Sequence, residues 1–244
     1  MHRFYVDHFP VPGGEVTLSP EDAHHARDVL RLQPNDAVEL LCEGLRFSAR
    51  ITALSSAEVR LSVLDQLNGS EARLRITLFQ GLPKADKMDW IVQKAVELGV
   101  ERIVPVRMLR SVVRLDDRDA ARKTERWQRI AREAGKQSGR CMLPEVSLPV
   151  RPDAVVTSVR QRDAFIVPWE ECPHYGPLHF AQEHPQLQSL AILIGPEGGI
   201  APEEMALFEQ AGAIPMTLGP RILRTETAGL AAISAFMSLY GEME

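Results

Sequence analysis

From Leu74 onward, short apolar segments alternate with segments of helical periodicity, and this alternation limits the possible folds more than any other feature. The expected strands are Ile76–Leu82, Ile103–Val106, Ala164–Pro168, Leu190–Ile194 and Ile214–Leu218. The expected helices are an apolar stripe from Met88 to Gly99, residues 119–137, Pro202–Gly212 and Glu226–Tyr240. Strands that are apolar along their whole length are buried on both faces. The pattern therefore predicts an α/β fold with a mostly parallel sheet covered by helices.

The first 66 residues have a different pattern, that of a small β-rich domain with one helix. Ser19-Pro20-Glu21-Asp22 is a helix start, and the helix should run to about Leu32, before Pro34. The expected strands are Ala37–Cys42, Phe47–Leu54 and Glu58–Leu64, with a strand-like segment at the N-terminus. The turn-forming stretch 68–71 is the expected linker, which predicts domains at 1–70 and 71–244.

Composition indicates an ordinary globular protein, with 45% hydrophobic and 25% charged residues. The three cysteines, Cys42, Cys141 and Cys172, lie far apart without metal-ligand spacing, which indicates reduced thiols and no metal. No apolar run is long enough to span a bilayer, and the N-terminus lacks the apolar core of a signal peptide. We therefore expect a cytoplasmic protein without a membrane segment.

Charge is unevenly distributed, although the net charge is only −5. Residues 107–140 hold eleven Lys or Arg against five acids. A local positive field attracts a phosphate backbone. A charged, solvated amphipathic helix explains the same count, so charge alone leaves both interpretations open.

Two turns at strand ends are the most unusual segments of the chain. In an open parallel sheet, ligands bind beyond the carboxyl ends of the strands. Strand Leu190–Ile194 runs into Gly195-Pro196-Glu197-Gly198-Gly199, where glycines permit positive φ and close approach of the backbone to a ligand. Neither a P-loop nor GxGxxG is present, which argues against a nucleotide phosphate site or a nicotinamide oxidoreductase. A tight strand-to-helix turn without a ligand remains the alternative.

The second turn, Leu218–Ala228, joins a strand end to a helix start, with Thr225 as the expected N-cap. Its arginines, Arg221 and Arg224, could clamp a phosphate or stabilise a developing oxyanion. Alternatively, one of them pairs with Glu226 or Glu197. The small residues from Ala228 to Ala235 indicate close packing of the last helix.

These two turns, together with three upstream segments, resemble the 16S ribosomal RNA (uracil-N3) methyltransferase family of the SPOUT superfamily. The upstream matches are Lys87–Val100, Arg110-Ser111-Val112, and Glu133–Arg140, which fits the family's EAxxQSxR stretch. The five motifs occur in order and cover nearly the whole chain.

The resemblance implies a SPOUT-type C-terminal domain with a deep trefoil knot and a small N-terminal PUA-like β-barrel that binds RNA. It also implies S-adenosyl-L-methionine as the cofactor, 16S rRNA of the small ribosomal subunit as the partner, and a homodimer formed through the C-terminal domain. Carried over residue by residue, the cofactor contacts lie on three loops: Pro168, Trp169 and Glu170; Ile194, Gly195, Gly198 and Gly199; and Leu218, Gly219, Ile222 and Leu223.

Methylation of uracil N3 sets the expected roles of the charged residues. N3 becomes nucleophilic only as its proton leaves, and an arginine stabilises the charge that then spreads onto the carbonyl oxygens. Arg221 and Arg224 are the candidates for that role, and Glu197 or Glu226 for the base. The expected RNA contacts are Arg3, Arg27, Arg31, Arg110, Arg118, Arg122, Arg126 and Arg140.

Two other functions remain open at this stage. A SPOUT methyltransferase acting on a different RNA would keep the fold and the cofactor. An RNA-binding assembly factor without catalysis would be expected to show eroded cofactor turns, and both turns are intact here.

Overall fold

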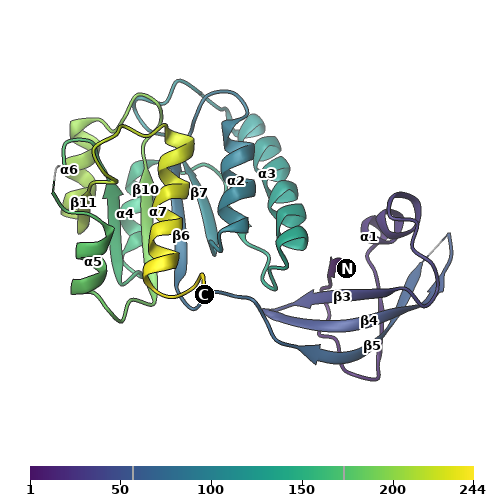
Figure 1. Cartoon of the computed structure of the whole chain (residues 1–244). Coiled ribbons are helices and arrows are strands. Elements are labelled where there is room, and N and C mark those ends of the chain that lie inside the picture. Colours follow the sequence, from purple (N-terminus) through teal and green to yellow (C-terminus); the bar gives the residue numbers. More distant parts are fainter. Residues whose placement is uncertain (57, 173) are drawn as a thin grey trace. The chain divides into compact units, whose positions relative to one another are not determined.

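The chain is organised as two compact units, shown in a computed structural model that describes residues 1–56, 58–172 and 174–244 (Figure 1). Unit 1 comprises Met1–Glu71 together with Gly135–Leu143, and unit 2 comprises Ala72–Ala134 and Pro144–Glu244. The expected boundary near residue 70 is close to the end of the first stretch. The predicted domain division did not include residues 135–143 in the first domain, although they belong to unit 1 despite their distance in the sequence from residues 1–71.

Unit 1 is built on one five-stranded sheet in the order β1-β3-β4-β5-β2. Its strands are β1 (His2–Tyr5), β2 (Glu15–Thr17), β3 (Ala37–Cys42), β4 (Leu45–Leu54) and β5 (Val59–Leu67). β1 pairs with β3 in parallel and the other neighbours are antiparallel. Among the described residues no ladder joins β1 to β2, so hydrogen bonding does not close the expected barrel. The hydrophobic core of this unit contains Phe4, Leu40 and Phe47.

The helical segment of unit 1 begins as expected and ends early. Ser19 caps α1 (Pro20–His24) by accepting a hydrogen bond from the Asp22 amide, 3.2 Å away. A wider π-helical turn, η1 (His25–Val29), follows, and the expected continuation to Leu32 is wrong. Arg31 has a φ of 54°, which ends the helix and lets Leu32 turn back into the core.

Buried ion pairs hold residues 135–143 in unit 1. Lys136 Nζ lies 2.8 Å from the carboxylate of Asp22, whose side chain is only 2% exposed. Arg140, 7% exposed, pairs with Glu71 at 2.8 Å, and Glu71 also accepts the amides of Cys141 and Met142. The hydroxyl of Tyr5 donates to the Arg140 carbonyl at 2.8 Å. This network makes Gly135–Arg140, the larger part of the EAxxQSxR stretch, a structural part of unit 1.

Unit 2 is an α/β domain with a six-stranded sheet in the order β11-β9-β10-β6-β7-β8, in which every described pair is parallel. The strands are β6 (Arg75–Gly81), β7 (Arg102–Val106), β8 (Glu145–Val146), β9 (Ala164–Pro168), β10 (Ser189–Ile194) and β11 (Ala213–Met216). The helices are α2 (Lys87–Glu97), α3 (Asp117–Ser138, which ends in unit 1), α4 (Pro152–Val159), α5 (Pro177–Glu183), α6 (Pro202–Gln210) and α7 (Thr225–Leu239). The mostly parallel sheet expected from the alternation is confirmed.

Alternate residues of the strands face two separate cores, so the sheet forms the middle of three layers. Leu78 and Ile192 face a core shared with α2, α3, α5 and α7. Phe79 and Leu193 face the other core, shared with α4 and α6. Burial on both faces explains why these strands are apolar throughout. Within the described residues, no helix is both long and apolar enough to cross a membrane.

The Glu71 network yields a prediction about unit 1. Glu71→Gln should lower the stability of this unit by about 2–3 kcal/mol, because it removes the negative charge that pairs with the buried guanidinium of Arg140. Hydrogen exchange of the β3–β5 amides measures this directly. The matched control is Glu58→Gln, which removes an exposed pair with Arg60 and should cost under about 1 kcal/mol. Equal protection in the two variants would contradict the prediction.

Candidate functional site

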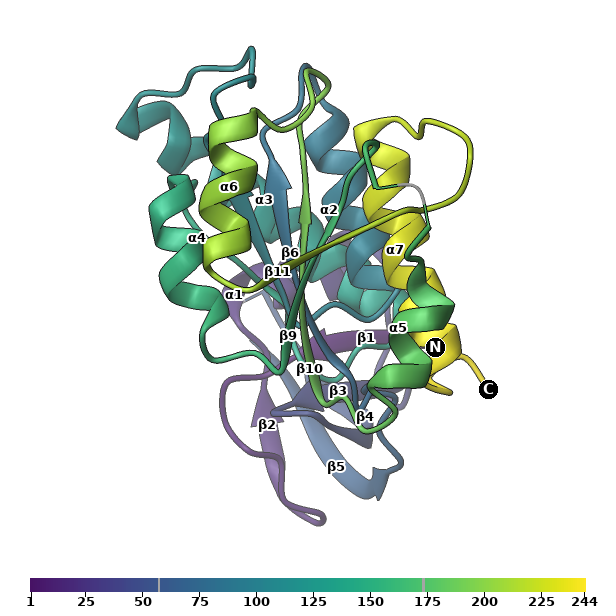
Figure 2. The same cartoon turned by 90° about the vertical axis from the view of Figure 1, so that its left-hand side faces the viewer.

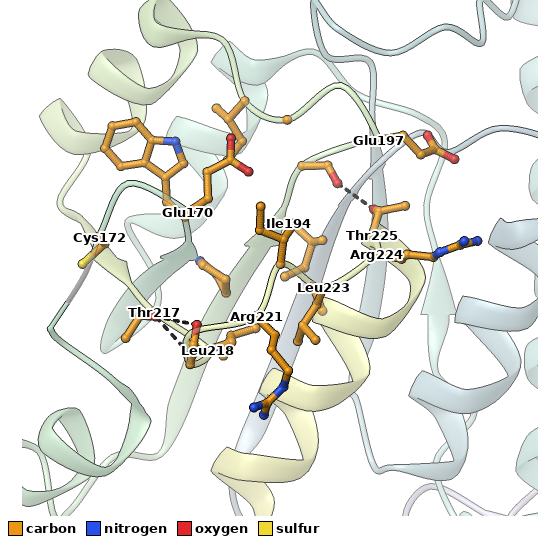
Figure 3. Close-up of a pocket in the computed structure, with 18 of the residues that line it drawn as sticks. Glu170, Cys172, Ile194, Glu197, Thr217, Leu218, Arg221, Leu223, Arg224 and Thr225 are labelled. Atoms are coloured by element: carbon orange, nitrogen blue, oxygen red, sulfur yellow. Dashed lines mark hydrogen bonds between the residues drawn. The ribbon is translucent and has the colours of Figure 1, made fainter.

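Three loops at the carboxyl ends of β9, β10 and β11 surround a cavity of about 750 Å³ in unit 2. Figure 2 shows the β10–α6 and β11–α7 loops at the same end of the sheet, and Figure 3 shows the lining side chains. This is the position where open parallel sheets bind ligands. A volume of this size is typical of small-molecule sites.

The cavity contains nearly all of the residues selected from the sequence. All but one of the expected cofactor residues line it: Pro168, Trp169, Glu170, Ile194, Gly195, Gly199, Leu218, Gly219, Ile222 and Leu223. Arg221, Arg224 and Glu197 line it as well. Gly198 is the exception because it packs on the Arg110 loop, where an added Cβ would meet the Arg110 backbone at 2.9 Å.

Two glycines give the loops a conformation that other residues rarely adopt. Gly199 has a φ of 74°, and a Cβ there would point between Arg110 and Glu170, with the nearest atoms at 3.7 and 3.9 Å. Gly219 has a φ of 103°, with no atom within 4 Å of an added Cβ. A side chain at either position would strain the backbone and occupy space beside the cavity.

A buried hydroxyl joins the second loop to the start of α7. Thr225 Oγ1 donates to the Gly195 carbonyl at 2.6 Å and accepts from the Gln80 amide at 2.9 Å. Gln80 lies on β6 and is fully buried. The expected N-cap role for Thr225 is wrong: Arg224 occupies the N-cap position, without a side-chain cap, and Thr225 is the first helical residue.

One lysine connects both carboxylates of the two turns. Lys87 Nζ lies 3.0 Å from Glu197 and 3.0 Å from Glu226. Burial tends to raise the pKa of both carboxyl groups, but hydrogen bonds from Lys87 and from backbone amides outweigh it, so each pKa is lowered. Hydrogen bonds to the same two groups raise the pKa of Lys87. Both carboxylates are therefore ionised and weakly basic, which argues against either as the expected base.

The two arginines of the third loop do not form a clamp in this structure. Arg221 and Arg224 leave the loop in different directions (Figure 3). Both are exposed, and within the described residues neither side chain has a hydrogen-bond or ion-pair partner. The alternative in which one of them pairs with Glu197 or Glu226 is wrong, since both carboxylates form their ion pair with Lys87.

A further arginine lies beside the second loop. Arg110 donates from Nη1 to the Gly198 carbonyl at 3.2 Å. Its loop is fixed by Glu204, a buried residue of α6 whose carboxylate accepts the Leu109 amide at 2.8 Å. Arg110 is thus held close to the turn that carries Gly199.

The other expected RNA-contacting arginines are distributed over both units. On α3, Arg118, Arg122 and Arg126 are exposed; Arg122 pairs with Asp119, and Arg126 with Asp89. In unit 1, Arg31 is exposed and Arg27 bonds Asp28 and the Ser55 and Ser56 carbonyls. Arg3 pairs with Glu39 and donates to the carbonyls of residues 136 and 137. Arg140 is buried against Glu71.

Sequence reasoning missed several residues of the cavity. Lys87, Thr217 and Thr225 line it, together with Cys172, Ile200 and Ala228. One signal was available, because Gln80 is a polar residue next to the apolar run Leu78-Phe79 of a buried strand and marks a buried hydrogen bond. Across the described residues, no group of three or more His, Cys, Asp or Glu side chains could hold a metal ion.

Solved structures that resemble this chain contain a ligand. A ribosomal RNA small subunit methyltransferase E from Neisseria gonorrhoeae, bound to S-adenosyl methionine, is 35% identical and covers 98% of each chain, with a TM-score of 0.88. A putative methyltransferase from Legionella pneumophila, in complex with the same cofactor, is 32% identical, with a TM-score of 0.85; the match covers 97% of this chain and 96% of that one.

Sequence comparisons agree over almost the entire length. A ribosomal RNA small subunit methyltransferase E from Bacillus subtilis is 34% identical over 227 residues, which is 90% of this chain and 88% of that protein. Residues 18–64 match the RNA methyltransferase PUA domain, and residues 70–237 match the RNA methyltransferase domain. The chain therefore belongs to the RNA methyltransferase domain family and carries the PUA domain of such enzymes.

Proposed function

We propose that this protein transfers the methyl group of S-adenosyl-L-methionine to N3 of a specific uridine in 16S rRNA of the small ribosomal subunit. The observation that carries the proposal is the cavity formed by the three loops, in a fold whose 35% identical neighbour has S-adenosyl methionine bound. The relatives' names, which specify small-subunit ribosomal RNA, support the choice of acceptor.

The residues around the cavity suit an S-adenosylmethionine molecule. The positive φ of Gly199 and Gly219 leaves loop backbone uncovered beside the cavity, where amides and carbonyls recognise the edge of a purine or an amino-acid group. Ile194, Leu218 and Leu223 provide apolar surface, and the volume is adequate. When bound, the cofactor supplies a methyl group already activated by its sulfonium, so the protein mainly aligns donor and acceptor.

The chain's own residues must then make uracil N3 reactive. N3 lies on the Watson–Crick edge, so the base has to be unpaired or extruded before it can enter the site. Arg221 and Arg224, both without partners among the described residues, are available to stabilise the charge that develops on the uracil carbonyl oxygens. Arg110, beside the second loop, is the third candidate for contact with the acceptor nucleotide.

RNA contact is proposed at exposed arginines of both units. On α3 these are Arg118, Arg122 and Arg126, and on unit 1 it is Arg31; Arg27 is half-buried and bonds Asp28 and the carbonyls of Ser55 and Ser56, so it would have to leave these partners to contact RNA. Arg122 and Arg126 each have one acidic neighbour, and because both guanidinium groups are exposed, a phosphate can replace or join it. Arg3 and Arg140 bond groups within unit 1, so we assign them to its structure and not to the RNA surface.

The finer features implied by the family resemblance belong to the same proposal. The chain leaves β11 at the sheet edge, beside β9, whereas α7 packs over β10 and β6. A connection that crosses back in this way supports a deep trefoil knot around the cavity. We also propose a homodimer through the C-terminal domain, consistent with the small residues of α7, and a cytoplasmic location.

The decisive experiment locates the transferred methyl group. The protein is incubated with labelled S-adenosylmethionine and small ribosomal subunits from cells that lack the modification, and N3-methyluridine is mapped in the 16S rRNA. Transfer to a single uridine is expected. Label on tRNA alone would replace the acceptor, and tight RNA binding without transfer would indicate a non-catalytic assembly factor.

Gly199→Val should abolish cofactor binding, with a loss of affinity of at least about a hundredfold in calorimetry, because the side chain strains the turn and points beside the cavity. Gly212→Val is the matched control: Gly212 has a φ of 88°, lies at the α6–β11 turn and has open space around an added Cβ. It should cause similar strain with unchanged cofactor affinity. Equal affinity in both variants would remove this turn from the cofactor site.

Arg224→Ala should lower kcat by about a hundredfold and leave cofactor affinity nearly unchanged, because the guanidinium acts on charge that develops only in the transition state. Steady-state kinetics and calorimetry measure the two quantities separately. Arg160→Ala, at the end of α4 on the other face of the sheet, is the control and should change neither. A selective loss of cofactor affinity would assign Arg224 to the donor instead.

A further inference from the structure

Lys87 connects three segments of the site that are far apart in the sequence. It is the first residue of α2, and its Nζ lies 3.0 Å from Glu197 in the second loop and 3.0 Å from Glu226 in the first turn of α7. The carboxylate of Glu197 also accepts the Lys84 amide, at 3.1 Å, from the segment that precedes α2. Lys87 thereby adds the start of α2 to the lining of a cavity otherwise formed by three loops.

The position of Lys87 indicates a specific contact and not a general surface charge. A cation at the first residue of a helix faces the positive end of the helix dipole, which is unfavourable. Glu226 is the second residue of α7, and its negative charge interacts favourably with the positive end of its own helix dipole. The cost at Lys87 is offset by two carboxylates whose side chains are only 24% and 18% exposed, with Lys87 itself at 29%. Partly buried charges this close need their counter-ion.

Removal of the ammonium would leave two carboxylates facing each other. Both have a lowered pKa because Lys87 and backbone amides favour the ionised form against the effect of burial. Arg224 contributes a smaller effect on Glu226, in the same direction. The other charged groups around the cavity are Arg221, Arg110 and Glu170. Without Lys87, mutual repulsion of the carboxylates favours uptake of one proton, which the pair can share.

We infer that Lys87 is a positioning residue of the methyl-transfer site: its ammonium holds the second loop against the start of α7 and so keeps the cofactor cavity in shape. The inference rests on the proposed function, because the shape of the cavity matters through the ligand that it binds. Lys87 acts through Glu197 and Glu226 and does not itself take part in the chemistry.

The test compares S-adenosylmethionine affinity, measured by calorimetry, among three variants and the wild type. Lys87→Met, which keeps the length of the side chain, should weaken binding about tenfold. Lys87→Arg, which keeps the charge, should restore most of the affinity. Lys94→Met is the matched control on the same helix, since Lys94 pairs with Glu97 and does not line the cavity; it should bind like the wild type.

A pH series separates positioning by charge from a merely structural effect. The wild type and Lys94→Met should keep a constant affinity ratio between about pH 5 and pH 8, because both carboxylates stay ionised in each protein. The loss of S-adenosylmethionine affinity in Lys87→Met should become smaller as the pH falls, because a proton shared by the two carboxylates partly replaces the ammonium. A Lys87→Met to wild-type ratio that does not change with pH, or failure of Lys87→Arg to restore binding, would overturn the inference.

A second variant covers the case in which Lys87→Met does not fold. Glu226→Gln leaves one carboxylate for one ammonium and removes only the α7 arm of the contact. It should lower affinity about threefold, with no pH dependence relative to the wild type. Wild-type affinity in this variant would overturn the inference. A wild-type protein that does not bind S-adenosylmethionine would instead refute the proposed function, so the two failures are distinguishable.

Discussion

The geometry of the cavity depends on the hydroxyl of Thr225, because its two hydrogen bonds join three segments of the chain. It donates to the Gly195 carbonyl and accepts from Gln80, so the central strand β6, the second loop and α7 meet at one buried oxygen. Such a contact requires α7 to approach the sheet closely. Gly229 lies on this face of α7, where an added Cβ would make ordinary contacts, at 3.5 Å, with the side chains of Gln80 and Ile194.

Two contacts hold the walls of the cavity together, one between neutral groups and one between charged groups. The Thr225 hydrogen bonds lie at the buried side, where an unpaired charge would be costly. Lys87, Glu197 and Glu226 lie nearer the surface, where partial solvation makes a three-membered charge cluster tolerable. Both contacts join the same two pieces of chain, the second loop and the start of α7. The third loop, which carries Arg221 and Arg224, is therefore held at its far end and keeps its two guanidinium groups free.

The sequence was sufficient to predict the strands and the second and third loops, because burial on both faces makes each strand apolar and glycines mark these two turns, whereas the first loop followed only from the family resemblance. It was insufficient for features that depend on spatial neighbours. Nothing in Ser189–Ile194 shows that β10 lies between β9 and β6. The short strands β2 and β8 and the helices α4 and α5 were missed because so few residues give little periodicity. Arg140 and Arg118 count equally as positive charges in the sequence. In the structure, however, Arg140 is buried in an ion pair with Glu71, whereas Arg118 is exposed to solvent.

The state of the carboxylates bears on how N3 loses its proton. A base must take up a proton in the transition state, and Glu197 and Glu226 are made less able to do so by the same ammonium. Stabilisation of the uracil anion by an arginine lowers the affinity of N3 for its proton, which reduces the demand on any acceptor. In a partly open site, that acceptor need only be water or the exposed Glu170. Under the proposed function, this arrangement favours catalysis by anion stabilisation over catalysis by a strong base, in keeping with arginine side chains that stay unpaired while a lysine neutralises the turn carboxylates.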